Sequence, residues 1–207
     1  EQKKLGELLS AGSEGLLENY LAARDMVDLA WEYPSARFEP QEYINALKRL
    51  QPRLYSVASS SIVYPNSVHL TVGIVRYKVS EKEWKGVTSS YLTERLKTVE
   101  MAVPIFHAPS HFKMPEDLTK DLIMVGPGTG VAPFRAFLQE YVAREGTGRM
   151  WLFFGERYRS KEFLYENELL DYATKGHLHR LDLAFSRDQA HKVYVQHKML
   201  EQAKELW

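Results

Sequence analysis

Apolar residues recur at spacings of three and four over the first 50 residues, which is the spacing of one face of a helix. The clearest run is Leu16, Leu17, Tyr20 and Leu21. Glycine and proline interrupt the pattern near Gly12 and Pro34, and Pro40 suits the first turn of a helix. We therefore expect two or three short helices over residues 1–50, and this segment carries no chemical motif.

From residue 53 the pattern alternates, which predicts strands. Every second residue is apolar in the run Val68, Leu70, Val72 and Ile74. The turn residues Pro65 and Asn66 precede this run, so we expect Arg53–Ala58 and Val68–Val79 to form an antiparallel pair. Further on, the sequence predicts a helix at Thr88–Lys97 and a strand at Val103–His107.

Beyond Pro115 the order of the patterns is β-α-β-α-β-α. The expected strands are Leu122–Val125, Met150–Phe154 and Leu178–Phe185, and the expected helices are Val131–Arg144, Lys161–Lys175 and Val193–Trp207. Such an alternation indicates a parallel sheet with right-handed crossovers and a ligand crevice at the carboxyl ends of its strands. A domain boundary is therefore expected between residues 115 and 120.

The amino-acid composition excludes several classes of ligand and of catalysis. Lys plus Arg number 27 and Asp plus Glu number 27, so no basic excess favours nucleic acid. Cysteine is absent, which excludes disulfides, Cys-ligated zinc, Cys-ligated iron–sulfur clusters and thiol catalysis. Redox chemistry would therefore need a bound cofactor. The sequence holds neither a His-Glu-x-x-His motif nor a Gly-x-Ser-x-Gly motif, so we expect no metal site and no esterase or peptidase of that kind.

The ends of the chain carry two further expectations. No apolar run approaches the ~20 residues that span a bilayer, and the first four residues, Glu-Gln-Lys-Lys, lack the apolar core of a signal peptide, so we expect a cytoplasmic protein. The chain starts without Met and stops at Trp207 inside a helical pattern, so we expect it to be part of a longer polypeptide.

The strongest local motif is Gly126-Pro127-Gly128-Thr129-Gly130, between an expected strand and an expected helix. Glycines let a phosphate approach the backbone, and free N–H groups at a helix start favour an anion. The alternative is a tight strand-to-helix turn that binds no ligand. No Gly-Lys-Ser/Thr follows, so a P-loop of the triphosphatase type is rejected.

Cations gather at the ends of the next two expected strands. Arg157 and Arg159 follow Glu156, and Ser186-Arg187 is followed by Lys192 and Tyr194. A guanidinium can bind phosphate oxygens bidentately, so these residues favour NADPH, with its extra phosphate, over NADH. A solvated loop, in which these cations pair with neighbouring acids, is the alternative.

Two segments upstream of the glycine loop can each be explained in two ways, as part of a binding site or as ordinary structure. Arg53 and Tyr55 share one face of an expected strand, where they could bind a phosphate and a flat heterocycle, or could be an exposed cation beside a sheet aromatic. The segment from Gly86 to Ser90 is either a second pyrophosphate-binding turn or a good helix start.

Three ordered motifs resemble the FAD- and NADPH-binding module of the diflavin reductases, and the resemblance covers nearly the whole chain. Arg53–Ser60 is similar to the flavin motif of that family, Gly126–Arg135 to its nicotinamide motif, and Phe185–Gln189 with Lys192–Gln196 to its 2′-phosphate motif. The implied fold is α+β and α/β: a partial antiparallel FAD-binding β-barrel with a helical connecting segment, then a Rossmann-like parallel-sheet NADP-binding domain, truncated at its end. The implied domains are residues 1–50 (connecting segment), 51–117 (barrel portion) and 118–207 (NADP-binding domain).

The resemblance also implies roles for single residues. Arg53 would bind the FAD pyrophosphate, Tyr55 would pack on the isoalloxazine ring, and Ser56, the one catalytic candidate, would lie near flavin N5. The other implied FAD-binding residues are Leu54, Thr71, Val72, Gly73, Tyr77 at the adenine end, and Gly86, Val87, Thr88 and Ser89 at the pyrophosphate. The implied NADP-binding residues are Gly128, Thr129, Gly130, Ser186, Arg187, Lys192, Tyr194 and Gln196, with Arg157 as a weaker candidate.

The expected activity is transfer of hydride from NADPH to FAD, followed by single electrons to an FMN-binding flavodoxin-like domain and a haem or iron–sulfur acceptor such as a sulfite reductase haemoprotein. The segments Val131–Gln139 and Trp151–Glu156 look more like the sulfite reductase branch of the family than the P450 reductase branch, which remains an alternative. The family's leading barrel strand, FMN domain, Cys-Gly-Asp segment and terminal aromatic are missing. A truncated, non-catalytic nucleotide-binding or interaction fragment is therefore the second hypothesis.

Overall fold

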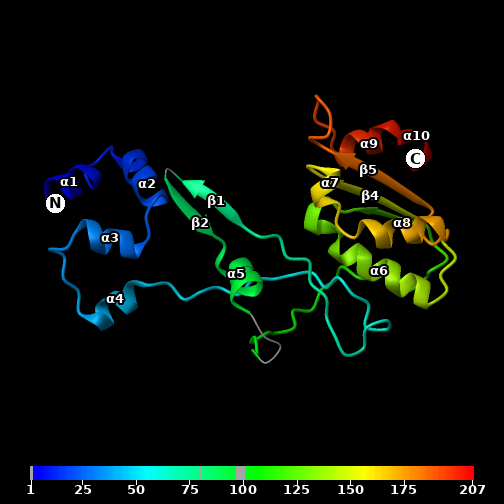
Figure 1. Ribbon diagram of the computed structural model, residues 1–207, viewed down its shortest axis with the longest axis horizontal. Coiled ribbons are helices and arrows are strands. Elements are labelled where there is room, and N and C mark those ends of the chain that lie inside the picture. Colours follow the sequence, from blue (N-terminus) through cyan, green and yellow to red (C-terminus); the bar gives the residue numbers. More distant parts are fainter. Residues whose placement is uncertain (1, 80, 97–100) are drawn as a thin grey trace. The chain divides into compact units, whose positions relative to one another are not determined.

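The computed structural model describes residues 2–79, 81–96 and 101–207 (Figure 1). The chain divides into two compact units, which we describe separately. Unit 1 comprises residues 1–53 and 74–102, and unit 2 comprises residues 54–73 and 103–207. The segment 54–73, which the sequence analysis assigns to the barrel portion, thus groups with the parallel sheet.

Unit 1 begins with four short helices: α1 (Gln2–Leu8), α2 (Glu14–Ala22), α3 (Met26–Glu32) and α4 (Pro40–Ala46). The expected helical character of residues 1–50 is confirmed, although the described residues form four short helices and not the two or three expected, and Pro40 lies in the first turn of its helix. Asp25 caps α3, because its side chain accepts from the backbone N–H groups of Val27 and Asp28. Large apolar side chains such as Trp31 remain exposed, so packing among these helices is sparse.

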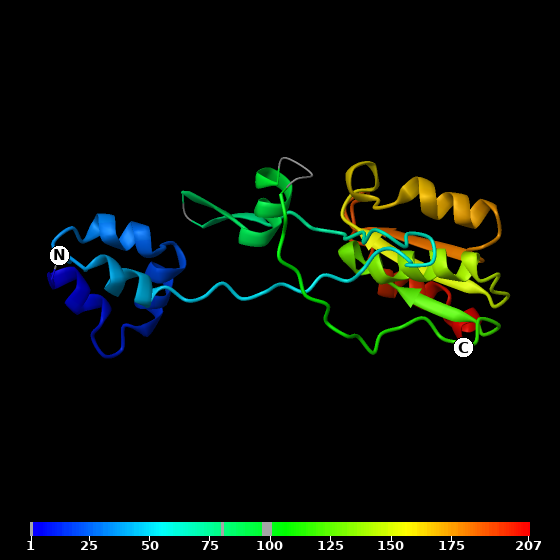
Figure 2. The same ribbon diagram turned by 90° about the horizontal axis from the view of Figure 1, so that it is seen from below.

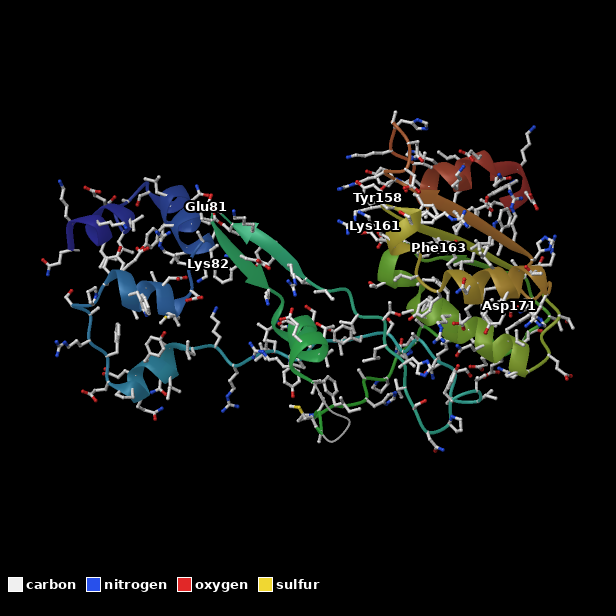
Figure 3. All side chains as sticks on the ribbon, viewed as in Figure 1. Glu81, Lys82, Tyr158, Lys161, Phe163 and Asp171 are labelled. Carbon is white, nitrogen blue, oxygen red and sulfur yellow. The ribbon has the colours of Figure 1, made fainter. Side chains whose placement is uncertain are left out.

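A β-hairpin follows in unit 1, formed by β1 (Arg76–Val79) and β2 (Lys82–Lys85). Lys82 lies where β2 begins (Figure 3) and donates both to Asp25, at 2.7 Å, and to Asp28. The hydrogen bond from Lys82 holds the pKa of Asp25 below its usual value. The cap of α3 and the hairpin are therefore joined by one ammonium group.

The predicted helix at Thr88–Lys97 is confirmed only in part. The chain forms α5 (Val87–Ser90) and then a π-helical turn, η1 (Tyr91–Arg95), while Lys97 lies outside the described residues. Ser89 and Ser90, the last two residues of α5, are buried, and the hydroxyl of Ser89 accepts from the backbone N–H of Val75 at 3.2 Å.

The predicted antiparallel pair Arg53–Ala58 with Val68–Val79 is wrong as a pair of strands. One bridge, Val57 to Leu70, joins the two segments, and only Arg76–Val79 becomes a strand. The alternating side chains have no layer to pack against, since Leu54 is 73% and Val68 63% exposed. An isolated pair of strands is marginal without a covered apolar face. The predicted strand Val103–His107 is likewise wrong, since these residues form no regular element, and Ile105 is 85% exposed.

Unit 2 contains the predicted parallel sheet, which is confirmed. Its strands are β3 (Leu122–Val125), β4 (Met150–Glu156) and β5 (Arg180–Phe185), paired in the order β3-β4-β5. The intervening elements are η2 (Gly128–Val131), α6 (Ala132–Ala143), α7 (Arg159–Glu162), α8 (Glu166–Thr174), α9 (Val195–Glu201) and α10 (Ala203–Leu206). The single helix predicted at Lys161–Lys175 is therefore two helices, separated at Phe163–Tyr165.

Helices cover both faces of the parallel sheet. Helices α6 and α8 lie on one side and α9 on the other (Figures 1 and 2). On the first side Leu152 and Phe154 of β4 pack with Leu138 of α6 and Leu169 of α8. On the other side Gly155 leaves room for Val195, whose Cγ1 lies 2.8 Å from where a glycine Cβ would be. All of β4 except Glu156 is buried, as expected of a central parallel strand.

The fold class is therefore a mixture of an α/β part and a small antiparallel part. The Rossmann-like parallel sheet is confirmed over three strands. The described residues form no closed barrel, so the predicted barrel portion is not confirmed. No helix of the described chain is both long and apolar enough to cross a lipid bilayer.

The burial of residues in unit 2 predicts which substitutions lower the free energy of unfolding. Leu152 is fully buried, whereas Leu200 of α9 is 72% exposed. We expect Leu152→Ala to lower the free energy of unfolding by about 3 kcal/mol, because it leaves a cavity, and Leu200→Ala to change it by less than about 0.5 kcal/mol. Urea denaturation followed by circular dichroism measures both. Equal losses would contradict the assigned core.

Candidate nucleotide-binding site

The glycine loop joins β3 directly to η2 and α6. The backbone N–H of Gly126 donates to Phe153 at 3.0 Å, which extends the sheet ladder one residue beyond β3. Gly128 then adopts a φ of +57°, a conformation that favours glycine. The chain turns within three residues and starts the helical run at the carboxyl end of the sheet, where a parallel sheet binds ligands.

The loop is a tight turn with a carboxylate beside it. A Cβ on Gly126 would lie within 2.9 Å of the carbonyl oxygen of Gly130 and the Cα of Val131, so only glycine permits this turn. Beside the loop, Glu156 brings one carboxylate oxygen to 3.2 Å from where a Cβ on Gly128 would be. Its other oxygen accepts from the backbone N–H of Arg157 at 2.9 Å.

The cation-bearing segments lie side by side at the ends of β4 and β5. The N–H of Ser186 donates to Glu156 and the N–H of Arg187 donates to Arg157, each at 2.8 Å, so the ladder continues past β5. The sequence prediction that these segments share one edge of the sheet is confirmed by this pairing.

The cations differ in whether an acid neutralises them. Arg157 pairs with Glu162, and this hydrogen bond raises the pKa of the guanidinium. Arg159 pairs with Glu166 at 2.8 Å. Within the described part of the chain, by contrast, Arg187 and Lys192 are exposed and form no ion pair. The sequence left two explanations for these cations, a phosphate site or a solvated loop of paired charges. Arg157 and Arg159 fit the second explanation, because each pairs with an acid. Arg187 and Lys192 are available to an anion and fit the first.

The remaining candidates on this edge lie around the start of α9. Ser186 is buried at the end of β5, and Tyr194 is 40% exposed immediately before α9. The backbone N–H of Tyr194 donates to Nδ1 of His197 at 3.0 Å, and the two rings lie 5.7 Å apart. Gln196, in the first turn of α9, is exposed. The ring of Tyr194 is thus partly accessible to solvent. It lies before α9, seven residues after Arg187 in the sequence.

Some of the residues expected to line the flavin lie in unit 2, close to the glycine loop. A Cβ on Gly73 would be 3.5 Å from Cγ2 of Thr129, which brings the stretch Thr71–Val72–Gly73 against the loop. Tyr55 is half-buried, whereas Leu54 and Ser56 are exposed. The residues expected to bind a flavin and those expected to bind a nicotinamide are therefore neighbours within this unit.

The other expected flavin residues lie in unit 1. Arg53 is exposed and donates to the carbonyl of Gln51. Tyr77 is 52% exposed and lies nearly parallel to Trp84 across the hairpin, with ring centroids 6.5 Å apart. Gly86 precedes α5 in tight contact, since a Cβ there would lie 2.7 Å from both Ser89 and Val75. The glycine and the buried serine therefore shape the turn before α5.

Sequence reasoning missed a buried charge beside this site. Arg135 of α6 is 7% exposed and pairs with Glu168 of α8 at 2.7 Å. The available signal was an arginine between Phe134 and Phe137 on an otherwise apolar helix face, because a charge in that position needs a partner. No group of three or more His, Asp or Glu side chains that could hold a metal ion occurs among the described residues.

Comparison with known proteins identifies the class. Residues 1–91 match the family model of the FAD binding domain, and residues 124–206 match that of the oxidoreductase NAD-binding domain. The predicted cofactor pair, FAD and NADPH, agrees with these two domain types. The two matches identify an FAD binding domain followed by an oxidoreductase NAD-binding domain, which confirms the predicted resemblance to the diflavin reductases.

Several curated relatives of the chain carry the same name, that of a sulfite reductase component. The chain is 43% identical over 204 residues to the sulfite reductase [NADPH] flavoprotein alpha-component of Bacillus subtilis, and 45% identical over 205 residues to that of Vibrio parahaemolyticus, with 99% of the chain covered in both comparisons. It is also 45% identical over 197 residues, 95% of the chain, to the protein of the same name from Escherichia coli O9:H4. The chain spans about a third of each relative, with 34%, 32% and 33% covered.

The ion pairing at the strand ends predicts unequal roles for two arginines. We expect Arg187→Ala to weaken binding of 2′,5′-ADP by about tenfold or more, because a free guanidinium forms charge-assisted hydrogen bonds with phosphate. Arg157→Ala should weaken it less than about threefold, since Glu162 already occupies that guanidinium. Isothermal titration calorimetry measures both constants. The Arg187 variant should also lose more affinity for NADPH than for NADH, and equal losses would contradict the assignment to the 2′-phosphate.

Proposed function

We propose that this chain is the FAD- and NADPH-binding module of an electron-transferring flavoprotein of the sulfite reductase type. NADPH supplies a hydride when bound, and FAD releases the two electrons one at a time. The chain's own residues bind the two cofactors, orient the nicotinamide against the flavin and keep that geometry fixed.

The observation that carries this proposal is the close approach of Gly73 to Thr129, where a Cβ added to the glycine would lie 3.5 Å from Cγ2 of the threonine. It joins the segment proposed to line the flavin to the loop proposed to bind NADPH, both inside unit 2. Hydride transfer requires the two rings to meet at a distance of about 3–3.5 Å, so the two binding segments must be neighbours.

The proposed NADPH site uses the carboxyl edge of the parallel sheet. Gly128, Thr129 and Gly130 admit the pyrophosphate to the start of η2 and α6. Arg187 and Lys192 bind the 2′-phosphate, and Tyr194 packs on the adenine. The hydroxyl of Ser186 and the amide of Gln196 bind the adenosine, with Arg157 in a minor role.

The proposed FAD site uses the remaining candidates. Tyr55 packs on the isoalloxazine ring, Ser56 lies near N5, and Leu54, Thr71, Val72 and Gly73 line the flavin. Arg53 and the segment Gly86–Ser89 bind the pyrophosphate, and Tyr77 meets the adenine. The hydroxyl of Ser89 is already bonded to Val75, so this residue would contribute its backbone N–H.

The proposed electron acceptors are an FMN-binding flavodoxin-like domain and then a haem or iron–sulfur protein. The names of the relatives support a sulfite reductase haemoprotein as that last acceptor, since each is an alpha-component of sulfite reductase. The P450 reductase type of module is the alternative within the family.

A second candidate function is nucleotide binding without a retained flavin. It is favoured by the exposure of the apolar residues on the flavin side, with Leu54 73%, Val68 63% and Ile74 56% exposed. Such a chain would bind NADP⁺ as an interaction module and perform no hydride transfer.

An absorption spectrum separates the two candidates. The purified chain is mixed with FAD, desalted, and treated anaerobically with NADPH. We expect the desalted protein to retain the absorption band of flavin in the blue region of the visible spectrum. This band should bleach when NADPH is added. A colourless protein that still binds 2′,5′-ADP would support the second candidate and contradict the first.

The proposed role of Ser56 has its own test. We expect Ser56→Ala to slow anaerobic bleaching of the flavin by about tenfold, a barrier change of about 1.4 kcal/mol. Ser61→Ala, a second exposed serine of the same unit, should leave the rate unchanged. If stopped-flow traces of the two variants coincide, Ser56 has no part in the transfer.

A further inference from the structure

A buried polar network joins three segments of unit 2 that are distant in sequence. Its centre is Arg135 on α6, whose side chain is only 9% exposed. The Nε group of Arg135 donates to Glu168 of α8 at 2.7 Å. The Nη1 group donates to the carbonyl of Ala58 at 2.6 Å and lies 3.1 Å from Nδ1 of His69. One guanidinium thus joins two helices of the nicotinamide-binding domain to both halves of the segment 54–73.

A second side chain of α6 repeats this arrangement one turn later. Gln139 donates to the other carboxylate oxygen of Glu168 at 2.9 Å and accepts from the backbone N–H of Ser60 at 3.0 Å. Because Glu168 binds both Arg135 and Gln139, it fixes the two groups that contact residues 58–60. The carboxylate also contacts Tyr172, and burial, with the charge of Glu168, raises the pKa of that phenol to about 12.

Tyr165 connects the same network to the stretch next to the glycine loop. The guanidinium of Arg135 lies over the ring of Tyr165, 4.7 Å from its centroid. The hydroxyl of Tyr165 lies 2.6 Å from Oγ1 of Thr71, and its backbone has a φ of +59°, which is uncommon for a tyrosine. Two residues beyond Thr71, the backbone of Gly73 lies close to the loop, since a Cβ added there would be 3.5 Å from Cγ2 of Thr129.

We propose that Arg135 and Glu168 form a latch that holds residues 54–73 against the loop Gly126–Gly130, so that both are positioning residues for hydride transfer. The inference rests on the proposed function. Arg135 touches neither the loop glycines nor the candidates at the adenosine end, and it acts through Ala58, His69 and Thr71. A shift of this segment by 1 Å is enough to slow transfer strongly, because the reaction requires close alignment.

Glu168→Gln tests the latch, and Glu140→Gln is its matched control. Glu168 accepts from Arg135 of α6 at 2.7 Å, Glu140 accepts from Arg144 directly after α6 at 3.0 Å, and the two glutamate side chains have similar exposure, 28% and 31%. Only Glu168 belongs to the network that reaches residues 58–71. A milder second variant, Tyr165→Phe, removes only the hydroxyl that binds Thr71 and keeps the ring beneath Arg135.

The first measurement is hydrogen exchange, which needs no cofactor. In Glu168→Gln we expect the amides of Ala58 and Ser60 to exchange at least about tenfold faster than in the wild type, while amides of β4 remain unchanged. Glu140→Gln should match the wild type. Unchanged exchange at Ala58 and Ser60, or equal acceleration in the control, would overturn the latch.

The second measurement is anaerobic stopped-flow reduction of the FAD-loaded chain by NADPH. We expect both latch variants to slow the transfer at saturating NADPH by about tenfold or more, with the dissociation constant of 2′,5′-ADP within twofold of the wild type. Equal losses of rate and affinity would reveal general damage and overturn the positioning role, as would a wild-type rate. If the wild-type chain itself is not reduced, the proposed function fails, and the exchange data alone decide the latch.

Discussion

The buried guanidinium of Arg135 is the constraint on which the arrangement of unit 2 depends. A charge removed from water is tolerated only when it is paired and its donors are satisfied. Glu168, the carbonyl of Ala58 and Nδ1 of His69 meet that requirement from three separate segments. The contacts of this side chain, with those of Gln139 and Tyr165, therefore hold residues 54–73 in place, although those residues form a single bridge instead of a sheet.

The sequence predicted the parts of the fold in which local pattern and burial agree. The alternation beyond residue 115 produced the three parallel strands, because continuous apolar runs such as Met150–Phe154 are stable only between two helical layers. The pattern at Val68–Ile74 was as regular, yet those residues did not form a strand there, since an alternating pattern requires a surface to cover it. Periodicity indicates which face is apolar and does not supply the partner.

The sequence likewise predicted some features of the candidate site and missed others. Glycine spacing predicted the loop, because the steric demand at Gly126 is local and leaves a mark in the sequence. The positions of the cations after two neighbouring strands predicted an anion site, and only the resemblance made Arg157 a weaker candidate than Arg187, since the positions alone gave no reason to rank them. That distinction depends on Glu162, which is brought to Arg157 by α7, and no comparable acid pairs with Arg187 in the described chain. Which cation remains available to a phosphate is decided by tertiary pairing and not by composition.

Helix α6 links the loop to the latch mechanically. Its start follows the loop Gly126–Gly130 through η2, and Arg135 lies in its first turn. A packed helix moves as a rigid body, so a displacement that adjusts the loop to a dinucleotide also displaces Arg135 and, through it, Ala58 and Thr71. The flavin-side segment and the nucleotide loop are then not free to adjust separately. Under the proposed function, nucleotide binding at the start of α6 and the position of the proposed flavin-lining residues both depend on where this one helix lies.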